Sequence, residues 1–461
     1  MSAVGLRMTH GQHARLLEHL HPGDGQEAAA WLLCGRRAGA DRHVLCVRDV
    51  FPIDHAATDR GAAHVTWHTS SLAPVFAAAA QLDTPAIVHV HSHPAGAERF
   101  SRVDDEADAA LHEDLAKVYN DGLPTASLIL LPDGRMRGRS FVDGQATPLE
   151  RICVVGERIT IVSEFDDAVT DRAFLASQRQ AFGDGTRDRL RPLRIAIVGC
   201  SGTGSVVVEL LSRLGVGELI LVDPQVVEER NLNRIINSSV ADVAAGRSKV
   251  RALADAVTRN LGDCAPRFQC IAGTLQDAWP VVATADIVFG CTDSAEARMH
   301  LDLLCHHYTL PYFDVGVDIS ADGHGGVRYV GAAVHYLQPG GDSLLARKGY
   351  RMSTVEAEAL RRESPERYAE QRRVGYIEHV EEDRPAVISL NTFAASMAVN
   401  ELLARVHGFR GDSDTAFAAR RVHLREEYTR FEPAGSPCPT MSPHLGRGDC
   451  TPPLGISSWQ R

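Results

Sequence analysis

The stretch RIAIVGCSGTGSVVVELL, residues 194–211, combines an apolar strand, a glycine-rich turn and an apolar helix. A second apolar strand, ELILVD (218–223), follows it, and a third, ADIVFGC (285–291), comes after the helical pattern of residues 248–260. Continuous apolar strands separated by helices are typical of parallel strands covered on both faces. This part of the chain is therefore predicted to form a Rossmann-like, doubly wound, mostly parallel sheet of the α/β class.

The glycine-rich turn predicts a nucleotide site. Gly199, Gly202 and Gly204 permit a tight turn and a close approach of phosphate to the N-terminus of the helix. Asp223 ends the next strand, where its carboxylate can accept a hydrogen bond from a ribose hydroxyl. These features alone indicate only a nucleotide, because NAD-binding folds share them.

Polar residues after the later strands indicate which reaction the nucleotide site catalyses. Asn231 and Arg234 lie just beyond the second strand, Lys249 opens a helix, and Asp293 ends another strand. Cations and a carboxylate that converge on a nucleotide phosphate favour phosphate chemistry with Mg²⁺ over hydride transfer. Arg298, five residues after Asp293, also has a plainer interpretation as an ion-pair partner on a helix surface.

A second motif, HSHPAGAERFSRVDD, occupies residues 91–105. Side chains two residues apart on an extended segment point to the same side, so His91 and His93 can meet one metal ion. Asp104, at the start of the following helical pattern, can supply a third ligand. Two histidines and one carboxylate with an open fourth position form a catalytic zinc arrangement, in which bound water becomes hydroxide near neutral pH.

Hydrolysis at such a metal also needs a proton shuttle and a donor for the developing oxyanion. Ser101 can be that donor, and Glu27, in EAAAWLLCG, is a candidate shuttle. Spacing alone says little for Glu27, because the chain has 59 acidic residues. His89 shares the strand and the direction of the two histidine ligands. It is interpreted as a core histidine or as a neighbour behind the ligands.

The pattern His-x-His-x(7)-Ser-x(2)-Asp resembles the JAMM motif of the JAB/MPN metalloproteases, and the resemblance covers about residues 1–145. Members of that family cleave ubiquitin and ubiquitin-like tails and isopeptide bonds. The resemblance implies a zinc ion held by His91, His93 and Asp104. It also implies Glu27 as general acid and base and Ser101 as the group that stabilises the oxyanion.

Residues 170–430 resemble the ThiF/MoeB/ubiquitin-activating superfamily, which uses ATP to adenylate the C-terminal carboxylate of ubiquitin-fold proteins. The resemblance implies that the glycine loop and Asp223 hold the nucleotide and that Asp293 holds Mg²⁺. The phosphate contacts that it implies come from Asn231, Arg234 and Lys249.

The same resemblance also covers ASQRQAFG (176–183). Its Arg179 corresponds to an arginine that reaches into the ATP site of the partner subunit, which implies a homodimer. Ser201 replaces a usual glycine. Relatives often hold a structural zinc with two CxxC pairs, but Ser343, Ala346 and Met441 replace three of those cysteines. We therefore expect no structural zinc in this half, because Cys438 alone cannot bind one.

The domain organisation follows from the two motifs. We expect an N-terminal α/β JAB/MPN domain at residues 1–150 and a linker with the first helix of the adenylation domain at 151–190. The adenylation domain is expected at 191–430, and an irregular tail, rich in Pro, Gly and Ser, at 431–461.

Composition predicts which classes of partner and which cellular compartment suit the chain. A formal net charge of −11 argues against a nucleic-acid partner. No apolar run approaches the roughly 20 residues that cross a bilayer, and the N-terminus lacks the pattern of a signal peptide. The ten cysteines are scattered without a CxxC pair, as in a protein of the reducing cytoplasm.

Together these features predict a bifunctional enzyme that trims or deconjugates a ubiquitin-like protein and adenylates its Gly-Gly-type C-terminus, with a conjugating enzyme as a further partner. An alternative is activation of a sulfur-carrier protein together with a sulfurtransferase, and another is a non-catalytic binding scaffold. The chain has no cysteine between Cys305 and Cys438. Cys200 and Cys291 are close to the predicted nucleotide site but are interpreted as packed small residues, whereas Cys438 and Cys450 in the tail could swing in to form a thioester. We expect the acyl-adenylate to pass directly to a thiol or amine on another molecule.

Overall fold

The computed structural model describes residues 3–39, 41–163, 173–183, 185–321, 324, 326–374, 377 and 386–459. The chain divides into two compact units. Unit 1 comprises Met1–Asp167, His306–Thr309 and His444–Arg461, and unit 2 comprises Ala168–Cys305 and Leu310–Pro443. The segment expected to precede the late helix, about residues 316–385, is described except for residues 322, 323, 325, 375, 376 and 378–385. Among the helices that are described, none is both long and apolar enough to span a bilayer.

Unit 1 is built on a nine-stranded sheet with the order β11-β10-β1-β3-β2-β6-β7-β8-β9. Its strands are β1 (Ala3–Thr9), β2 (Ala29–Ala38), β3 (Arg42–Pro52), β6 (Pro85–Ser92), β7 (Thr125–Leu130), β8 (Met136–Val142), β9 (Gln145–Pro148), β10 (Arg151–Val155) and β11 (Ile159–Ser163). The central strands β2 and β6 are buried over nearly their whole length, because helices cover both faces of the sheet.

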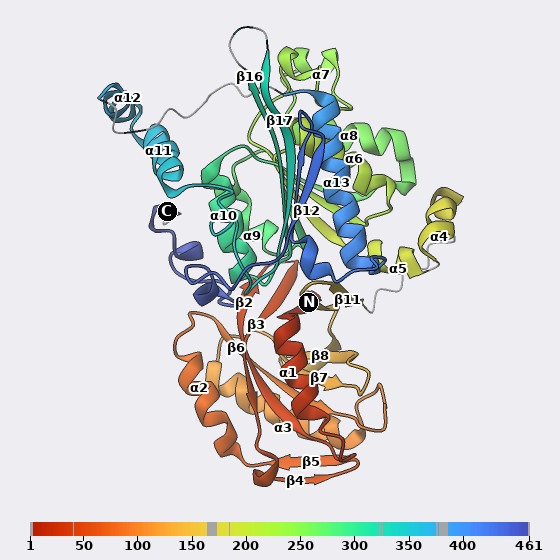
Figure 1. Ribbon diagram of the computed structural model, residues 1–461. Coiled ribbons are helices and arrows are strands. Elements are labelled where there is room, and N and C mark those ends of the chain that lie inside the picture. Colours follow the sequence, from red (N-terminus) through yellow and green to blue (C-terminus); the bar gives the residue numbers. More distant parts are fainter. Residues whose placement is uncertain are drawn as a thin grey trace. The chain divides into compact units, whose positions relative to one another are not determined.

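Alternation along β2 divides the core of unit 1 into two layers. Leu32 and Cys34 face a cluster that includes side chains of α1 (His10–Leu20), whereas Trp31 and Leu33 face a cluster with α2 (Ala73–Ala79) and α3 (Arg102–Tyr119). A two-stranded hairpin, β4 (Thr58–Gly61) and β5 (His64–Trp67), adds Trp67 to the second cluster. The sheet and its helices are the lower part of Figure 1.

The last residues of the chain pack in unit 1. Gly35 N donates to Gly446 O at 3.0 Å, and Asp449 N donates to Arg36 O at 2.6 Å. A Cβ atom on Gly35 would lie 2.2 Å from Arg447 O, so the tail fits only because position 35 has no side chain. Unit 1 therefore extends beyond the expected 1–150. The tail forms only short 3₁₀ turns, as expected of an irregular segment. It is nevertheless packed, because its backbone forms hydrogen bonds with β2.

Unit 2 is built on an eight-stranded sheet with the order β14-β13-β12-β15-β16-β17-β18-β19. Its strands are β12 (Arg194–Val198), β13 (Glu218–Val222), β14 (Arg267–Ile271), β15 (Ile287–Gly290), β16 (Tyr312–Ala321), β17 (Val327–Leu337), β18 (Ala419–His423) and β19 (Tyr428–Glu432). The first five strands in the order are parallel, and β16 to β19 pair antiparallel. The predicted doubly wound, mostly parallel α/β fold is confirmed.

Helices cover both faces of this sheet. Figure 1 shows α6, α8 and α13 on one side and α9 and α10 on the other. The helices of unit 2 are α4 (Ala176–Phe182), α5 (Gly185–Leu190), α6 (Gly202–Arg213), α7 (Val240–Ala244), α8 (Lys249–Leu261), α9 (Leu275–Val282), α10 (Ala295–His307), α11 (Met352–Glu363), α12 (Pro365–Arg373) and α13 (Ile388–His407). The connections from neighbouring strands β12 and β15 run to opposite faces, which opens a crevice at their carboxyl ends.

The two segments in which no structural zinc is expected, residues 340–349 and 435–443, meet in unit 2. Cys438 N donates to Gly341 O at 3.0 Å, and Gly435 N donates to Asp342 Oδ2 at 3.0 Å. Arg347 forms an ion pair with Asp342 and donates to the carbonyl oxygen of Tyr336. The hydrogen bonds from Cys438 N and Gly435 N therefore join the second segment to the first, and the ion pair orients Asp342 within the first.

Candidate active sites

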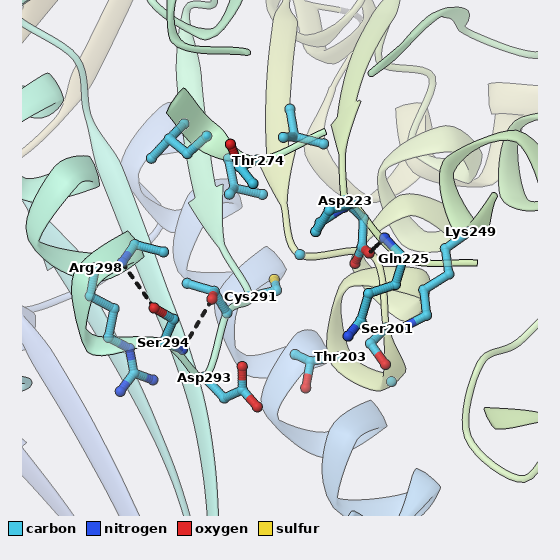
Figure 2. Close-up of a pocket in the computed structure, with 18 of the residues that line it drawn as sticks. Ser201, Thr203, Asp223, Gln225, Lys249, Thr274, Cys291, Asp293, Ser294 and Arg298 are labelled. Atoms are coloured by element: carbon cyan, nitrogen blue, oxygen red, sulfur yellow. Dashed lines mark hydrogen bonds between the residues drawn. The ribbon is translucent and has the colours of Figure 1, made fainter. Parts of the chain in front are cut away.

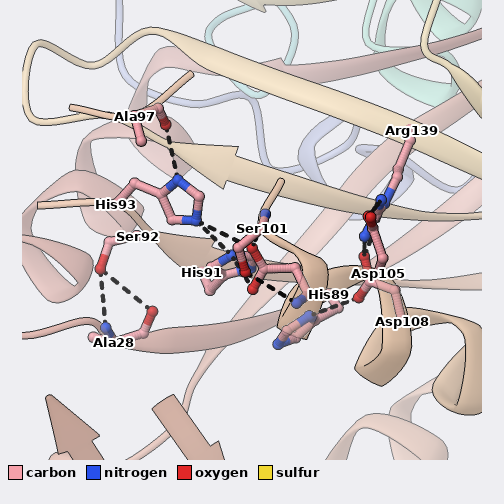
Figure 3. Close-up of polar contacts among 11 residues, drawn as sticks. Ala28, His89, His91, Ser92, His93, Ala97, Ser101, Asp105, Asp108 and Arg139 are labelled. Carbon is pink, nitrogen blue, oxygen red and sulfur yellow. Dashed lines mark hydrogen bonds and ion pairs between the residues drawn. The ribbon is translucent and has the colours of Figure 1, made fainter. Parts of the chain in front are cut away.

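The two histidines of the HSHP motif, which Figure 3 shows, meet Asp104 at one point in unit 1. His91 lies near the end of β6, His93 follows that strand, and Asp104 is in the first turn of α3. His91 Nε2 lies 3.1 Å from His93 Nε2 and 3.3 Å from Asp104 Oδ1, and His93 Nε2 lies 3.5 Å from Asp104 Oδ2. All three ligand atoms lie within 4.8 Å of one another, as donors to a single ion must.

Local hydrogen bonds orient the ligands. Ser101 is the N-cap of α3, and its hydroxyl accepts a hydrogen bond from Asp104 N (3.2 Å) while Ser101 N donates to Asp104 Oδ2 (2.6 Å). His93 Nδ1 lies 2.8 Å from Ala97 O. Because a carbonyl oxygen only accepts, Nδ1 carries the proton and Nε2 offers its lone pair to the cluster.

Electrostatics act differently on the three ligands. Burial lowers the pKa of His91, which favours the neutral ring that binds metals. Burial alone would lower the pKa of His93 too, but hydrogen bonds with Asp104 and with Ala97 O outweigh it and raise that pKa, so a bound metal would displace a proton there. Burial alone would raise the pKa of Asp104, but hydrogen bonds with His91 and His93 outweigh it and hold that pKa well below the usual range. Two imidazoles and one carboxylate suit Zn²⁺, and the residues present therefore fit the ion that the sequence motif implies.

Glu27 lies beside the same cluster. It immediately precedes the paired part of β2, where Ala29 is opposite His91, and its backbone is held by Gly61 O (2.8 Å) and by Arg60 Nε (2.7 Å). Its side chain is buried, and burial raises the pKa of its carboxyl. The charge of His93 lowers that pKa, whereas the charge of Asp104 raises it. A buried carboxyl with a raised pKa beside a metal cluster can take up and return a proton.

His89 lies behind the ligands rather than among them. Its ring stacks on that of His91 with centroids 5.5 Å apart, and its Nδ1 lies 3.6 Å from Asp108 Oδ1. Asp108 in turn pairs with Arg139 at 2.7 Å (Figure 3). The sequence interpretation did not include Asp108 or Arg139. The spacing in the sequence could have indicated Asp108, because it lies one helical turn after Asp104 and therefore on the same face of α3.

Unit 2 contains a cavity of about 530 Å³ at the carboxyl ends of β12, β13 and β15 (Figure 2). Its volume is in the range of small-molecule sites. Most residues predicted for the nucleotide line it: Gly199, Gly202, Asp223, Asn231, Arg234, Lys249 and Asp293. The fold therefore brings together side chains from segments nearly a hundred residues apart.

The Asp223 carboxylate forms hydrogen bonds that hold the glycine loop in place. Its Oδ2 accepts from Cys200 N at 2.8 Å and its Oδ1 accepts from Gln225 N at 2.9 Å. Each oxygen keeps a lone pair for a ribose hydroxyl. Lys249 Nζ donates to Gln225 Oε1 at 2.6 Å, so Gln225, which the sequence interpretation missed, holds the predicted phosphate-binding lysine.

The remaining glycines of the loop make room for other parts of the site. A Cβ on Gly204 would lie 1.8 Å from Gly199 O, so Gly204 allows α6 to start directly against the loop. A Cβ on Gly202 would lie 2.1 Å from Asn391 Nδ2, and Thr203 Oγ1 donates to Asn391 Oδ1 at 3.3 Å. Asn391, from α13, also lines the cavity and was missed, because it is one of several polar residues in that helix and its local sequence does not set it apart.

Asp293 and Arg298 lie on the opposite wall, at the start of α10. Arg298 Nε donates to Asp314 Oδ1 at 3.1 Å, and Tyr312 donates to the same oxygen at 2.9 Å. Burial alone would lower the pKa of Arg298, but Asp314 outweighs it and raises that pKa. The plainer interpretation of Arg298 as a helix-surface ion pair is wrong, because this ion pair lies within the pocket wall.

Arg179 lies on α4, and the described lining of the cavity does not include it. Cys200 and Cys291, beside the nucleotide loop, are held by burial at thiol pKa values well above the usual range. Cys438 and Cys450 are also buried rather than displayed on a loose tail, and burial raises the pKa of Cys450.

Comparison with known families finds two matches. The model of the ThiF family matches residues 175–439. The chain belongs to the ThiF family. The model described as prokaryotic homologues of the JAB domain matches residues 10–141, so a JAB domain precedes the ThiF domain.

Individual relatives match part of the chain. Ubiquitin-like modifier-activating enzyme 5 of Drosophila sechellia is 30% identical over 168 residues, which cover 34% of this chain and 40% of that protein. The Bombyx mori enzyme of the same name is 30% identical over 171 residues, with coverage of 34% and 40%. The chain thus spans about two fifths of these relatives. Among solved structures, Escherichia coli MccB with ATP is 17% identical with a TM-score of 0.44, over 59% of this chain and 74% of that one.

Proposed function

We propose that unit 2 adenylates the C-terminal carboxylate of a ubiquitin-like protein. The observation that carries this proposal is the convergence of Asp223, Arg234, Lys249 and Asp293 on one cavity beside the glycine loop. In the reaction a carboxylate oxygen attacks the α-phosphorus of ATP, the acyl-phosphate bond forms, and pyrophosphate leaves with the electrons of the broken bond. Lys249 and Arg234 would neutralise the charge that develops on the phosphates.

Asp293 would hold the Mg²⁺ that accompanies ATP, which offsets the charge of the leaving pyrophosphate. Arg179 would act in the ATP site of a partner subunit, which requires a homodimer. The alternative of sulfur-carrier activation shares this step. It is supported by the burial of Cys438 and Cys450, since a buried thiol is poorly placed to attack an acyl-adenylate, which would then pass to another molecule.

We propose that unit 1 is a zinc peptidase that acts on the same class of extended, Gly-Gly-type tail. Zinc bound by His91, His93 and Asp104 would supply Lewis-acid activation and a water of lowered pKa. Glu27 would accept the proton of that water and return it to the leaving amine, and Ser101 would donate to the oxyanion. The complete ligand set argues against the alternative of a non-catalytic scaffold.

Two measurements test the assignments separately. Asp293→Ala should abolish ATP–pyrophosphate exchange that depends on a ubiquitin-like protein and leave peptide cleavage unchanged. His91→Ala should remove zinc, measured by metal analysis, and cleavage, and leave exchange unchanged. For the dimer, a mixture of Arg179→Ala and Asp293→Ala chains should regain exchange, since one hybrid site is intact. No recovery in a demonstrably mixed dimer would contradict action across subunits.

A further inference from the structure

The first turn of α10 is capped by a side chain from another helix. Glu358, on α11, accepts hydrogen bonds from Ser294 Oγ at 2.8 Å and from the backbone N–H groups of Ala295 (3.1 Å) and Glu296 (2.9 Å). Because α10 begins at Ala295, these N–H groups have no partner within their own helix. A carboxylate from 64 residues beyond Ser294 thus satisfies them.

A second contact joins the same two helices. Arg362, one turn after Glu358 on α11, forms an ion pair with Glu296. Ser294, Glu296 and Arg362 all line the nucleotide cavity, together with Asp293 (Figure 2 shows Ser294 and Asp293). Therefore α11 holds the beginning of α10 at two points on the wall of the pocket.

The position of Asp293 depends on this wall. Within the described part of the chain, the Asp293 carboxylate makes no hydrogen bond or ion pair, so its direction is set by the backbone of the loop that carries it. That loop is fixed at one end by Cys291 N, which donates to Val198 O at 2.8 Å. At the other end Ser294 N donates to Thr292 Oγ1 at 3.2 Å, and the Ser294 hydroxyl is held by Glu358.

We infer that Glu358 is a positioning residue that orients Asp293 toward the Mg²⁺ of bound ATP. This inference rests on the proposed adenylation function. Loss of the Glu358 carboxylate removes the acceptor of the Ser294 hydroxyl and of two N–H groups. Among the described residues, the Ser294 side chain is then held only by Ala297 N at 3.2 Å, so the turn that carries Asp293 relaxes. The glycine loop and Lys249 lie on the other wall, so contacts with the nucleotide that do not involve Mg²⁺ remain.

The test is calorimetric titration of the full-length protein with ATP, once in Mg²⁺ and once in EDTA. In Mg²⁺, Glu358→Ala should weaken ATP binding by about 10-fold, a typical effect of removing a residue that orients a metal ligand. In EDTA the affinity should equal that of the wild type. Glu358→Gln, which keeps one acceptor oxygen, should show a smaller loss. Glu356→Ala, at an exposed position on the same helix, is the matched control.

A merely structural role predicts a different pattern, in which affinity falls equally in Mg²⁺ and in EDTA, and that result would overturn the inference. Equal affinities of wild type and Glu358→Ala in Mg²⁺ would also overturn it. If Glu358→Ala does not fold, the same comparison is made with Glu358→Gln. Failure of the proposed function is distinguishable, because the wild type would then bind Mg²⁺–ATP without any exchange stimulated by a ubiquitin-like protein.

Discussion

Gly204→Ala tests whether the glycine loop is built around a contact that no side chain tolerates. A Cβ at position 204 would lie 1.8 Å from Gly199 O and 2.9 Å from Gly199 C, whereas Cβ atoms essentially never approach other heavy atoms below 3.0 Å. Both contacts are with backbone, so no rotamer change relieves them. The loop must move away from α6, although Gly199, at a φ of 91°, already has a conformation that few other residues adopt.

The magnitude follows from overpacking in a closely packed site, which costs about 1–3 kcal/mol of folding free energy. The same displacement moves the N–H groups that would contact phosphate, so ATP affinity should fall at least about 10-fold, equivalent to about 1.4 kcal/mol. Urea unfolding and calorimetric ATP titration measure the two effects. Gly411→Ala is the control, because a Cβ there meets open space. If Gly204→Ala binds ATP within about twofold of wild type and unfolds at the same urea concentration, the reasoning from the close approach of Gly204 to Gly199 O is refuted.

Three further predictions concern unit 1 and the core of unit 2. Glu27→Gln should retain zinc in metal analysis but lower the cleavage rate by about 10²–10⁴-fold, and cleavage at the wild-type rate would exclude Glu27 as proton shuttle. Gly35→Ala should lower the free energy of unfolding by about 1–3 kcal/mol, because its Cβ would overlap Arg447 O; a thermal melt identical to wild type would contradict the tail packing. Burial raises the pKa of Asp302 to about 6, so its folded-state pKa exceeds that of the unfolded chain and its contribution to stability is lost as pH rises through 6. Asp302→Asn should therefore gain stability relative to wild type between pH 4 and pH 7, by up to about 3 kcal/mol, and a pH-independent difference would refute this.

The sequence predicted those features that local spacing encodes. His91 and His93 are two residues apart on a strand, and the glycines around Gly202 lie between a strand and a helix, so their roles followed from period and turn chemistry. The strand–helix alternation likewise predicted the parallel sheet.

Residues that act across long sequence separations were not predicted. Asn391 and Gln225 line the nucleotide cavity, and Glu358 caps the helix that begins beside it. Nothing in their local sequence distinguishes these residues from ordinary polar residues, because tertiary packing brings them to the site. The tail was expected to be irregular, and its packing through Gly446 against Gly35 could not be inferred, since it depends on the absence of a side chain far away in the sequence.

The central claim is that one class of protein tail is processed in unit 1 and activated in unit 2. The most direct measurement is the intact mass of a ubiquitin-fold protein that carries a short extension after Gly-Gly, incubated with the zinc-loaded enzyme, Mg²⁺–ATP and hydroxylamine. The account predicts loss of the extension, blocked by a zinc chelator, and conversion of the new C-terminus to a hydroxamate only when ATP is present. An unchanged mass with a panel of such proteins, from enzyme that binds both zinc and ATP, would contradict the account.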